Sequence, residues 1–188
     1  MYFVEYREHS NQQGGLPVKA LLVIDMLVDF IDPQGALYIG PAAEKVVPQV
    51  KSRLEKYRSE GNPVIFICDS HLKDDIEFNL FPPHSVEGSG GDDIIPELTP
   101  KVDERVIEKR RFSAFVGTDL DLTLRDKGID EIELAGVVTN ICILYTAAMA
   151  RMYGYKVNVP ISAVASFDEE AHNFALKEME KTLGVTMI

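Results

Sequence analysis

The stretch Ile132-Glu-Leu-Ala-Gly-Val-Val-Thr-Asn-Ile-Cys142 leads from a predicted strand into a predicted helix. The apolar run from Ile132 to Val138 is typical of a buried strand, and Thr139 or Asn140 can cap the helix that follows. A cysteine in the first turn of a helix lies near free backbone N–H groups and the positive end of the helix dipole, and both favour the thiolate over the thiol. Cys142 is therefore a candidate nucleophile, with a small buried core cysteine as the alternative interpretation.

The same change from strand to helix recurs along the chain. Strands are predicted at Ala20–Asp25, Pro63–Cys68, Arg105–Glu108, Ile132–Val137, Lys156–Val159 and Val185–Ile188. Helices are predicted at Ala42–Glu60, Asp119–Lys127, Asn140–Tyr153 and Asp168–Leu183, each closed by a glycine. This alternation predicts an α/β fold, a three-layer αβα domain around a mostly parallel sheet of about six strands.

The composition limits the size of the fold and the kind of partner. With 188 residues, 46% of them hydrophobic, the chain suffices for one domain with a core and is too short for two ordinary ones. Its 19 basic and 30 acidic residues give a net charge of −11, which argues against nucleic acid and anionic membranes as partners. The expected partner is a small molecule, and the oligomeric state, including a homo-oligomer, is left open.

We expect a cytoplasmic protein with one folded domain. The N-terminal MYFVEYREHSNQQGG lacks a basic segment followed by an apolar run, and no apolar run approaches the ~20 residues of a membrane span. Two cysteines do not form a disulfide framework, so a reduced protein is expected. Residues 1–18 are expected to form an extension, mobile or docked on a neighbour, and residues 19–188 the single domain.

One interval breaks the alternation of strands and helices. From Asp69 to about Asp103 no helical period is sustained, and turn residues are frequent, as in Gly88-Ser-Gly-Gly91. A connection of about 35 residues is far longer than the usual loop of a compact domain and tends to carry function. We therefore expect this interval to contribute to a functional site.

Chemically apt side chains follow the predicted strands, at the edge where open parallel sheets bind their ligands. Asp25 ends the first apolar run and could act as a general base toward the Cys142 thiol, or it could cap a turn. Lys109 follows the third run and could orient that carboxylate and stabilise an oxyanion, although an exposed lysine is the commoner case. The joint occurrence of acid, cation and thiol predicts a catalytic site.

A second group has the residue types of a metal site. Asp69 and His71 alternate by two residues, so their side chains point the same way if the strand continues. His84 follows in the same interval, with Glu77 between the two histidines. A carboxylate with two imidazoles suits zinc or another divalent first-row ion, while a hydrogen-bonded Asp69–His71 pair is the alternative. His172, on an acidic predicted helix, is expected to be solvated or packed.

Motifs of one family occur in order from Lys19 to Ile188. They are Asp25-x3-Asp29-Phe30, Asp69-x-His71 followed by Phe81-Pro-Pro-His84, Lys109-x2-Phe112, and Gly136-x2-Thr139-x2-Cys142. In combination they resemble the isochorismatase-like cysteine hydrolases and, within these, the nicotinamidases (pyrazinamidases). Phe81 stands where many relatives have tryptophan, and Asn140 where many have aspartate.

The resemblance implies roles for residues that the spacing alone leaves open. It implies a catalytic triad of Asp25, Lys109 and Cys142, and a metal held by Asp69, His71 and His84 with Glu77 as a further ligand. It also implies a cis peptide between Val137 and Val138, which aims the backbone N–H groups of Val138 and Cys142 at an oxyanion. The expected cofactor is one divalent ion, zinc first, with Mn²⁺ or Fe²⁺ as alternatives.

The expected reaction is hydrolysis of nicotinamide to nicotinate and ammonia through a thioester on Cys142, a step of NAD salvage. Phe30 and Phe81 would pack against the faces of the pyridine ring. The alternative is another hydrolase of this fold acting on a different carboxamide or carbamoyl compound. Isochorismate-type members lack this cysteine and this metal set, which speaks against them. A non-enzymatic binding module, and a redox role for Cys142 with Cys68, are further interpretations.

Overall fold

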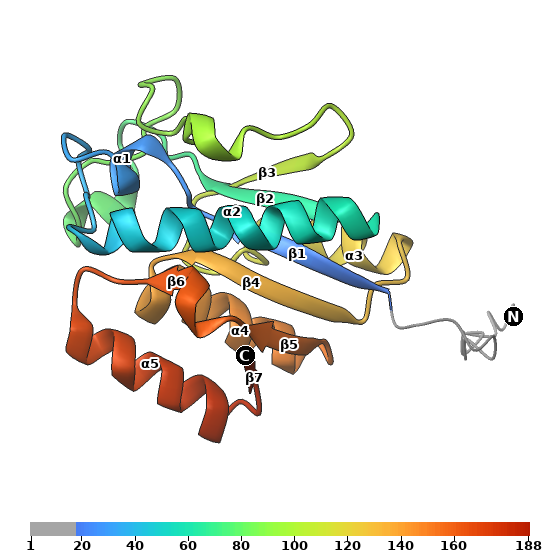
Figure 1. The fold of residues 1–188 in the computed structure, drawn as a ribbon. Helices are drawn as coiled ribbons and strands as arrows, with labels where there is room; N and C mark the ends of the chain where they lie inside the picture. The colour runs from blue at the N-terminus through green and yellow to red at the C-terminus, as the bar shows by residue number, and fades with distance from the viewer. Residues whose placement is uncertain (1–17) are drawn as a thin grey trace, which may run out of the picture.

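Parallel strands form the centre of the computed structural model, which describes residues 18–188 (Figure 1). The strands are β1 (Lys19–Ile24), β2 (Val64–Asp69), β3 (Arg105–Lys109), β4 (Glu131–Val137), β5 (Lys156–Val159), β6 (Val164–Ala165) and β7 (Thr186–Met187). They make one seven-stranded sheet in the order β3-β2-β1-β4-β5-β7, with β6 beside β4, and every pairing is parallel. The predicted parallel sheet is confirmed. The additional strand, β6, has only two residues and lies in the connection between β5 and α5, where the sequence analysis predicts no strand.

Helices cover both faces of the sheet, as the alternation predicts. The helices are α1 (Val28–Ile31), α2 (Ala42–Glu60), α3 (Leu120–Asp126), α4 (Leu144–Met152) and α5 (Glu169–Lys181). Short 3₁₀ turns are η1 (Ile76–Asn79), η2 (Pro96–Leu98) and η4 (Ile161–Ala163), and η3 (Thr139–Ile143) is a π-helical turn. The predicted helix at 140–153 is therefore η3 followed by α4. Helix α2 packs with its own core cluster on one face, whereas α3, α4 and α5 pack in the cluster on the other face.

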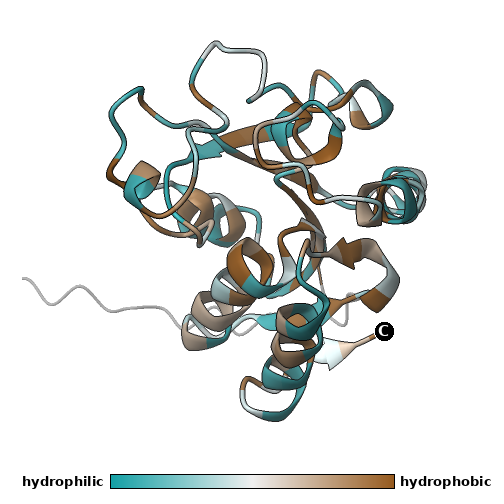
Figure 2. Ribbon diagram, turned by 90° about the vertical axis from the view of Figure 1, so that its left-hand side faces the viewer, coloured by the Kyte–Doolittle hydropathy of each residue, from teal (hydrophilic) through white to brown (hydrophobic). Residues whose placement is uncertain are grey.

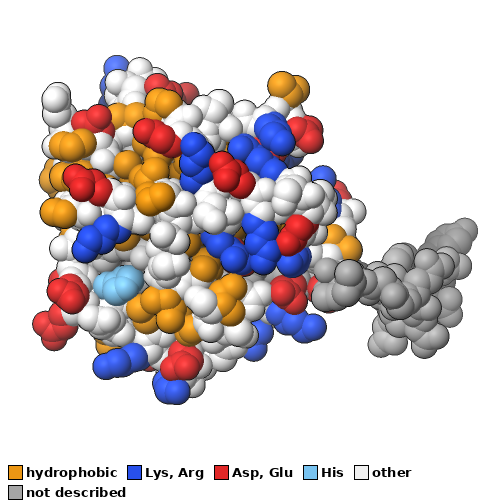
Figure 3. Space-filling model, viewed as in Figure 1, with side chains coloured by type: hydrophobic (Ala, Val, Ile, Leu, Met, Phe, Trp, Pro, Cys, Tyr) orange, Lys and Arg blue, Asp and Glu red, His pale blue; other side chains and the backbone are white. Residues whose placement is uncertain are grey.

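Burial of apolar side chains explains this layering. Val46, Val50 and Leu54 of α2 recur at helical spacing and are fully buried against the sheet. In Figure 2 hydrophobic residues dominate the strands between the helical layers. The opposite face of α2 is solvated, and Figure 3 shows basic and acidic side chains interspersed there. Within residues 18–188, no helix has both the length and the apolar character needed to cross a membrane.

The strand order places a crevice between β1 and β4. The chain moves from β1 to β2 and β3 on one side, and from β4 to β5 and β7 on the other, so the carboxyl ends of β1 and β4 flank a topological switch point. At this point the two strands approach so closely that a Cβ on Gly136 would lie 2.0 Å from the carbonyl oxygen of Ile24. Gly136 also has a φ of +126°, so a glycine is required where β4 enters the crevice.

Candidate active site

Three chemically active side chains meet at the carboxyl ends of β1, β3 and β4. The Nζ of Lys109 lies 2.9 Å from Oδ2 of Asp25 and 3.4 Å from Sγ of Cys142. A carboxylate oxygen of Asp25 lies within 4.8 Å of the same sulfur. All three side chains are buried. The structure therefore brings together the three residues that the sequence analysis expects to form a triad.

The Asp25 carboxylate is held by its own strained backbone and by β2. Asp25 has a positive φ of 52°, which is uncommon for a residue other than glycine. Its N–H donates to the carbonyl of Ile67, and its Oδ1 accepts the N–H of Asp69, at 2.8 and 2.9 Å. Within residues 18–188, Oδ2 has no partner with hydrogen-bond geometry, although the Lys109 ammonium lies 2.9 Å away. Oδ2 is therefore the oxygen available to take a proton.

Burial and charge set the protonation of Asp25 and Lys109. Burial and the neighbouring Asp69 carboxylate raise the pKa of Asp25, Lys109 opposes both, and the net result is a pKa of about 6. Burial alone would lower the pKa of Lys109, but the adjacent carboxylates of Asp25 and Asp69 outweigh it and raise the pKa well above its usual value. Near neutral pH Asp25 is thus a carboxylate with proton affinity suited to a general base, and Lys109 stays charged.

The expected lowering of the Cys142 pKa is wrong. Burial raises the pKa of this thiol well above its ordinary value, and the charge of the Asp25 carboxylate adds to the rise. Cys142 is 4% exposed and lies in the π-helical turn η3, so desolvation of a thiolate outweighs any helix-dipole effect. Cys142 therefore rests as a thiol, and a neighbouring base would have to take its proton before the sulfur could act as a nucleophile.

Hydrogen bonds within the turn that carries Cys142, and one contact from helix α5, stabilise that turn. The Val137–Val138 peptide is cis, as the resemblance implies, and the Val138 carbonyl accepts the N–H groups of Ile141 and Ile143 at 3.0 and 3.2 Å. The Nδ1 of His172, on α5, lies 2.9 Å from the hydroxyl oxygen of the buried Thr139. The sequence analysis missed this contact, since no local pattern links α5 to the turn.

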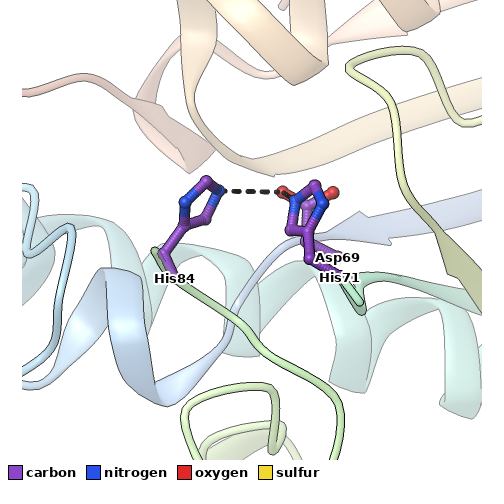
Figure 4. A group of neighbouring side chains, drawn as sticks. All are labelled: Asp69, His71 and His84. Carbon is purple, nitrogen blue, oxygen red and sulfur yellow. Dashed lines mark ion pairs between the residues drawn. The ribbon is translucent and has the colours of Figure 1, made fainter. Parts of the chain in front are cut away.

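Asp69, His71 and His84 form a compact group of metal-ligand type (Figure 4). The Nε2 of His71 and the Nε2 of His84 lie 3.7 and 3.9 Å from Oδ2 of Asp69. Ligand atoms about 2 Å from one zinc ion lie roughly 3–4 Å apart, so these separations fit a shared ion. Oε1 of Glu77 lies 3.9 Å from Nε2 of His71, which places the fourth expected ligand beside the group.

The hydrogen bonding of the two histidines also fits a metal. His71 is fully buried, and within residues 18–188 neither ring nitrogen has a partner with hydrogen-bond geometry. Nδ1 of His84 lies 2.8 Å from the carbonyl of Pro82. Because a carbonyl only accepts, Nδ1 carries the hydrogen, and Nε2 presents its lone pair toward Asp69. The donor set therefore suits a divalent ion of the zinc class.

The long interval after β2 positions His84 through backbone hydrogen bonds. The N–H of His71 donates to the carbonyl of Ser85 at 2.8 Å, and the N–H of Glu87 donates to the carbonyl of His71 at 2.9 Å. The carboxylate of Asp29 accepts the N–H of Ser85 at 2.7 Å. These hydrogen bonds hold the segment that follows His84 next to His71. The long interval therefore has a defined structure at the site, although it contains no long helix.

The two groups share one cavity. Its lining residues are Phe30, Leu37, Asp69, Glu77, Phe81, His84, Phe112, Val138, Ile141, Cys142 and Phe167. The free volume is about 20 Å³, which is room for roughly one water molecule. A ligand with a six-membered ring therefore requires part of the wall to move. Phe167, 50% exposed, is the one exposed residue of this lining.

The expected aromatic walls lie at the cavity as well. The rings of Phe30 and Phe81 meet the ring of His84 edge-on, with centroids 5.6 and 6.2 Å apart. Phe81 also packs edge-on against Phe112 at 6.2 Å. The cavity is thus lined both by aromatic side chains and by Cys142, Asp69, Glu77 and His84.

Solved structures of known proteins are similar to this chain in overall fold and in sequence. The structure is similar to the crystal structure of the nicotinamidase PncA from Bacillus subtilis, with a TM-score of 0.86 and 37% identity over 90% of this chain and 98% of that one. It is similar to N-carbamoylsarcosine amidase from Thermoplasma acidophilum, with a TM-score of 0.82 and 36% identity over 90% and 94%. It also resembles the pyrazinamidase of Pyrococcus horikoshii in complex with zinc, with a TM-score of 0.85 and 30% identity over 92% and 99%.

The family follows from a match over the whole described fold. A family model for the isochorismatase domain matches residues 19–188, which run from the first residue of β1 to the C-terminal residue. The chain belongs to the isochorismatase family of hydrolases.

Proposed function

We propose that this protein is a metal-dependent nicotinamidase, a cysteine amidohydrolase that converts nicotinamide to nicotinate and ammonia. The observation that carries the proposal is the shared cavity, which holds the Cys142 nucleophile and the ligand-type residues Asp69, Glu77 and His84 between aromatic walls. A planar ring with a basic nitrogen on one side and a carboxamide on the other matches this arrangement. The nicotinamidase and pyrazinamidase named above support the substrate class.

Acylation begins with the Cys142 thiol. Asp25 takes the thiol proton on Oδ2, and the sulfur attacks the carboxamide carbon. The backbone N–H groups of Val138 and Cys142 stabilise the oxyanion, and the Lys109 ammonium keeps Asp25 oriented. Asp25 then returns the proton to the leaving nitrogen, the carbon–nitrogen bond breaks, and ammonia departs from a nicotinoyl thioester.

In deacylation the Asp25 carboxylate again acts first as a base and then as an acid, now toward water and the Cys142 sulfur. Asp25 takes a proton from water while the water oxygen bonds to the acyl carbon. The carbon–sulfur bond breaks, and Asp25 gives the proton to the sulfur of Cys142. Nicotinic acid loses its own proton to solvent and leaves as nicotinate, which restores the thiol and the carboxylate.

Asp69, His71, Glu77 and His84 would hold the metal ion. When bound, the ion supplies a Lewis-acidic position for the ring nitrogen, so that it serves mainly to fix the substrate. Phe30 and Phe81 pack against the ring and keep water from its faces. With the ring fixed, the carboxamide is placed near the Cys142 sulfur, and positioning contributes to the rate.

Ammonia release from a panel of amides tests this proposal. Nicotinamide and pyrazinamide are expected to be hydrolysed far faster than aliphatic or carbamoyl compounds, N-carbamoylsarcosine included. Chelation of the metal is expected to raise the KM for nicotinamide strongly, since the ring nitrogen loses its anchor. The measurement is the initial rate with metal-replete protein, with and without chelator. Preferred turnover of a carbamoyl compound, unaffected by the chelator, would favour the carbamoyl hydrolase alternative.

Metal analysis of a His71→Ala variant is the control for the chelator. Removal of a buried ligand nitrogen is expected to lower the bound metal per protein well below that of the wild type. An unchanged metal content would remove His71 from the ligand set. Readdition of zinc to chelated wild-type protein is expected to restore its KM.

The pH dependence of kcat/KM follows from the protonation of Asp25. Its pKa of about 6 means that the general base is lost as the pH falls through 6. We therefore expect kcat/KM to be flat near neutral pH and to decline about tenfold per pH unit well below 6. Rates measured between pH 4.5 and 8, with circular dichroism to show that the protein stays folded, check this. A profile flat down to pH 4.5 would exclude Asp25 as the base.

A further inference from the structure

We propose that Asp75 is a positioning residue for the metal centre, holding His71 and Glu77 at once. The inference rests on the metal site of the proposed function and adds a residue that the sequence motifs do not include. Asp75 lies at the start of η1 in the long interval after β2, and its side chain is 2% exposed. A carboxylate so deeply buried requires partners, and each of its oxygens has one.

The first partner is the ring of His71. Nδ1 of His71 lies 3.3 Å from Oδ2 of Asp75, on the side of the ring opposite the metal-type group. The other nitrogen, Nε2, faces Asp69 and Glu77. The Nδ1 contact is within hydrogen-bond distance but misses hydrogen-bond geometry, so the ring must reorient before Nδ1 can donate to Asp75. A hydrogen on Nδ1 directed at Asp75 leaves the lone pair of Nε2 for the metal.

The second partner is the backbone of Glu77. Oδ1 of Asp75 accepts the Glu77 N–H at 3.1 Å, as the N-cap of η1. This bond fixes the first turn of η1 and with it the direction of the Glu77 side chain, which lines the active-site cavity. One carboxylate therefore orients a histidine and a carboxylate ligand that are six positions apart in the sequence (71 to 77).

Arg111 holds Asp75 from outside. Its Nη1 donates to Oδ1 of Asp75 at 3.0 Å and to Oδ2 at 3.3 Å, and the guanidinium is partly exposed. Arg111 lies two residues beyond Lys109, the last residue of β3, so the sheet itself anchors this support. A chain of contacts thus runs from the end of β3 through Arg111 and Asp75 to His71, on the side of the His71 ring away from Asp69.

The test is the zinc affinity of an Asp75→Asn variant, measured by competition with a chromophoric chelator. An asparagine can accept the Glu77 N–H, but its amide group then presents hydrogens to Nδ1 of His71 and favours the wrong tautomer. We expect zinc to bind about 10–100-fold more weakly than to the wild type. Asp74→Asn, which removes the same charge from the exposed neighbouring residue, is expected to bind zinc as the wild type does.

Metal-free melting temperatures separate positioning from simple stability. A positioning role predicts that metal-free Asp75→Asn melts close to the metal-free wild type, while its stabilisation by added zinc is smaller. If Asp75→Asn does not fold, Arg111→Met replaces it, and weaker zinc binding is expected there too. Wild-type zinc affinity in the folded variant would overturn the inference alone. A wild type that binds no zinc would overturn it together with the metal part of the proposed function.

Discussion

Replacing Cys142 with alanine is expected to lower kcat for ammonia release by about 10⁴-fold or more. The buried sulfur is the nucleophile that the protein supplies to the proposed reaction, and the substrate would remain bound beside a methyl group that cannot form a thioester. The group of Asp69, His71 and His84 does not contain Cys142, so zinc binding there and the binding of nicotinamide are expected to persist. Single-turnover kinetics and equilibrium binding, measured on the same preparation, check both expectations.

Cys68→Ala is the matched control for this variant. Cys68 is the other free cysteine, buried on β2, and its thiol has no part in the proposed mechanism. Its removal is expected to leave kcat close to that of the wild type. Near-native ammonia release by Cys142→Ala would contradict the thioester route. Loss of activity in Cys68→Ala with an unchanged melting temperature would instead indicate a role for the pair of cysteines.

Replacing Asp25 with asparagine is expected to lower kcat by about 10²–10⁴-fold, the usual contribution of a general base. The Cys142 thiol has its pKa raised by burial, so without a base very little thiolate forms. Asparagine keeps the shape of the side chain and can still accept the N–H of Asp69 through its amide oxygen. The decline of kcat/KM below pH 6 is expected to disappear together with the rate. Steady-state rates from pH 4.5 to 8 give both quantities.

Asp103→Asn is the control for the charge. Asp103 is an exposed aspartate in the connection before β3, so its replacement changes the net charge equally without touching the cavity. It is expected to keep both the wild-type rate and the decline at acid pH. An Asp25→Asn variant that retains the acid limb would show that another group sets the pH dependence.

Much of the fold was predictable because strands and helices leave patterns among residues that are close together in the sequence. Apolar runs of four to seven residues alternate with helices whose buried side chains recur at helical spacing, and these patterns follow from strand and helix geometry. The side chains at the strand ends were predictable for a related reason, since the carboxyl ends of parallel strands share one edge. Asp25, Asp69 and Lys109 could therefore be expected together before any distance was known. Strand β6, the π-helical turn η3 and the place of Asp75 left no such pattern.

The motif residues and their order along the chain were determined by the sequence alone. The type of sheet was too, because the patterns that indicate strands and helices involve residues only a few positions apart. The protonation of Cys142 and the contacts of His71 and His172 are properties of the tertiary structure. The burial of the Cys142 thiol and the side chains that contact these histidines depend on which distant segments of the chain pack around them. A pattern of residues a few positions apart cannot predict that packing. For this reason Cys142 could be proposed as a nucleophile from the chain alone, whereas the charge of its side chain in the resting site was decided by folding.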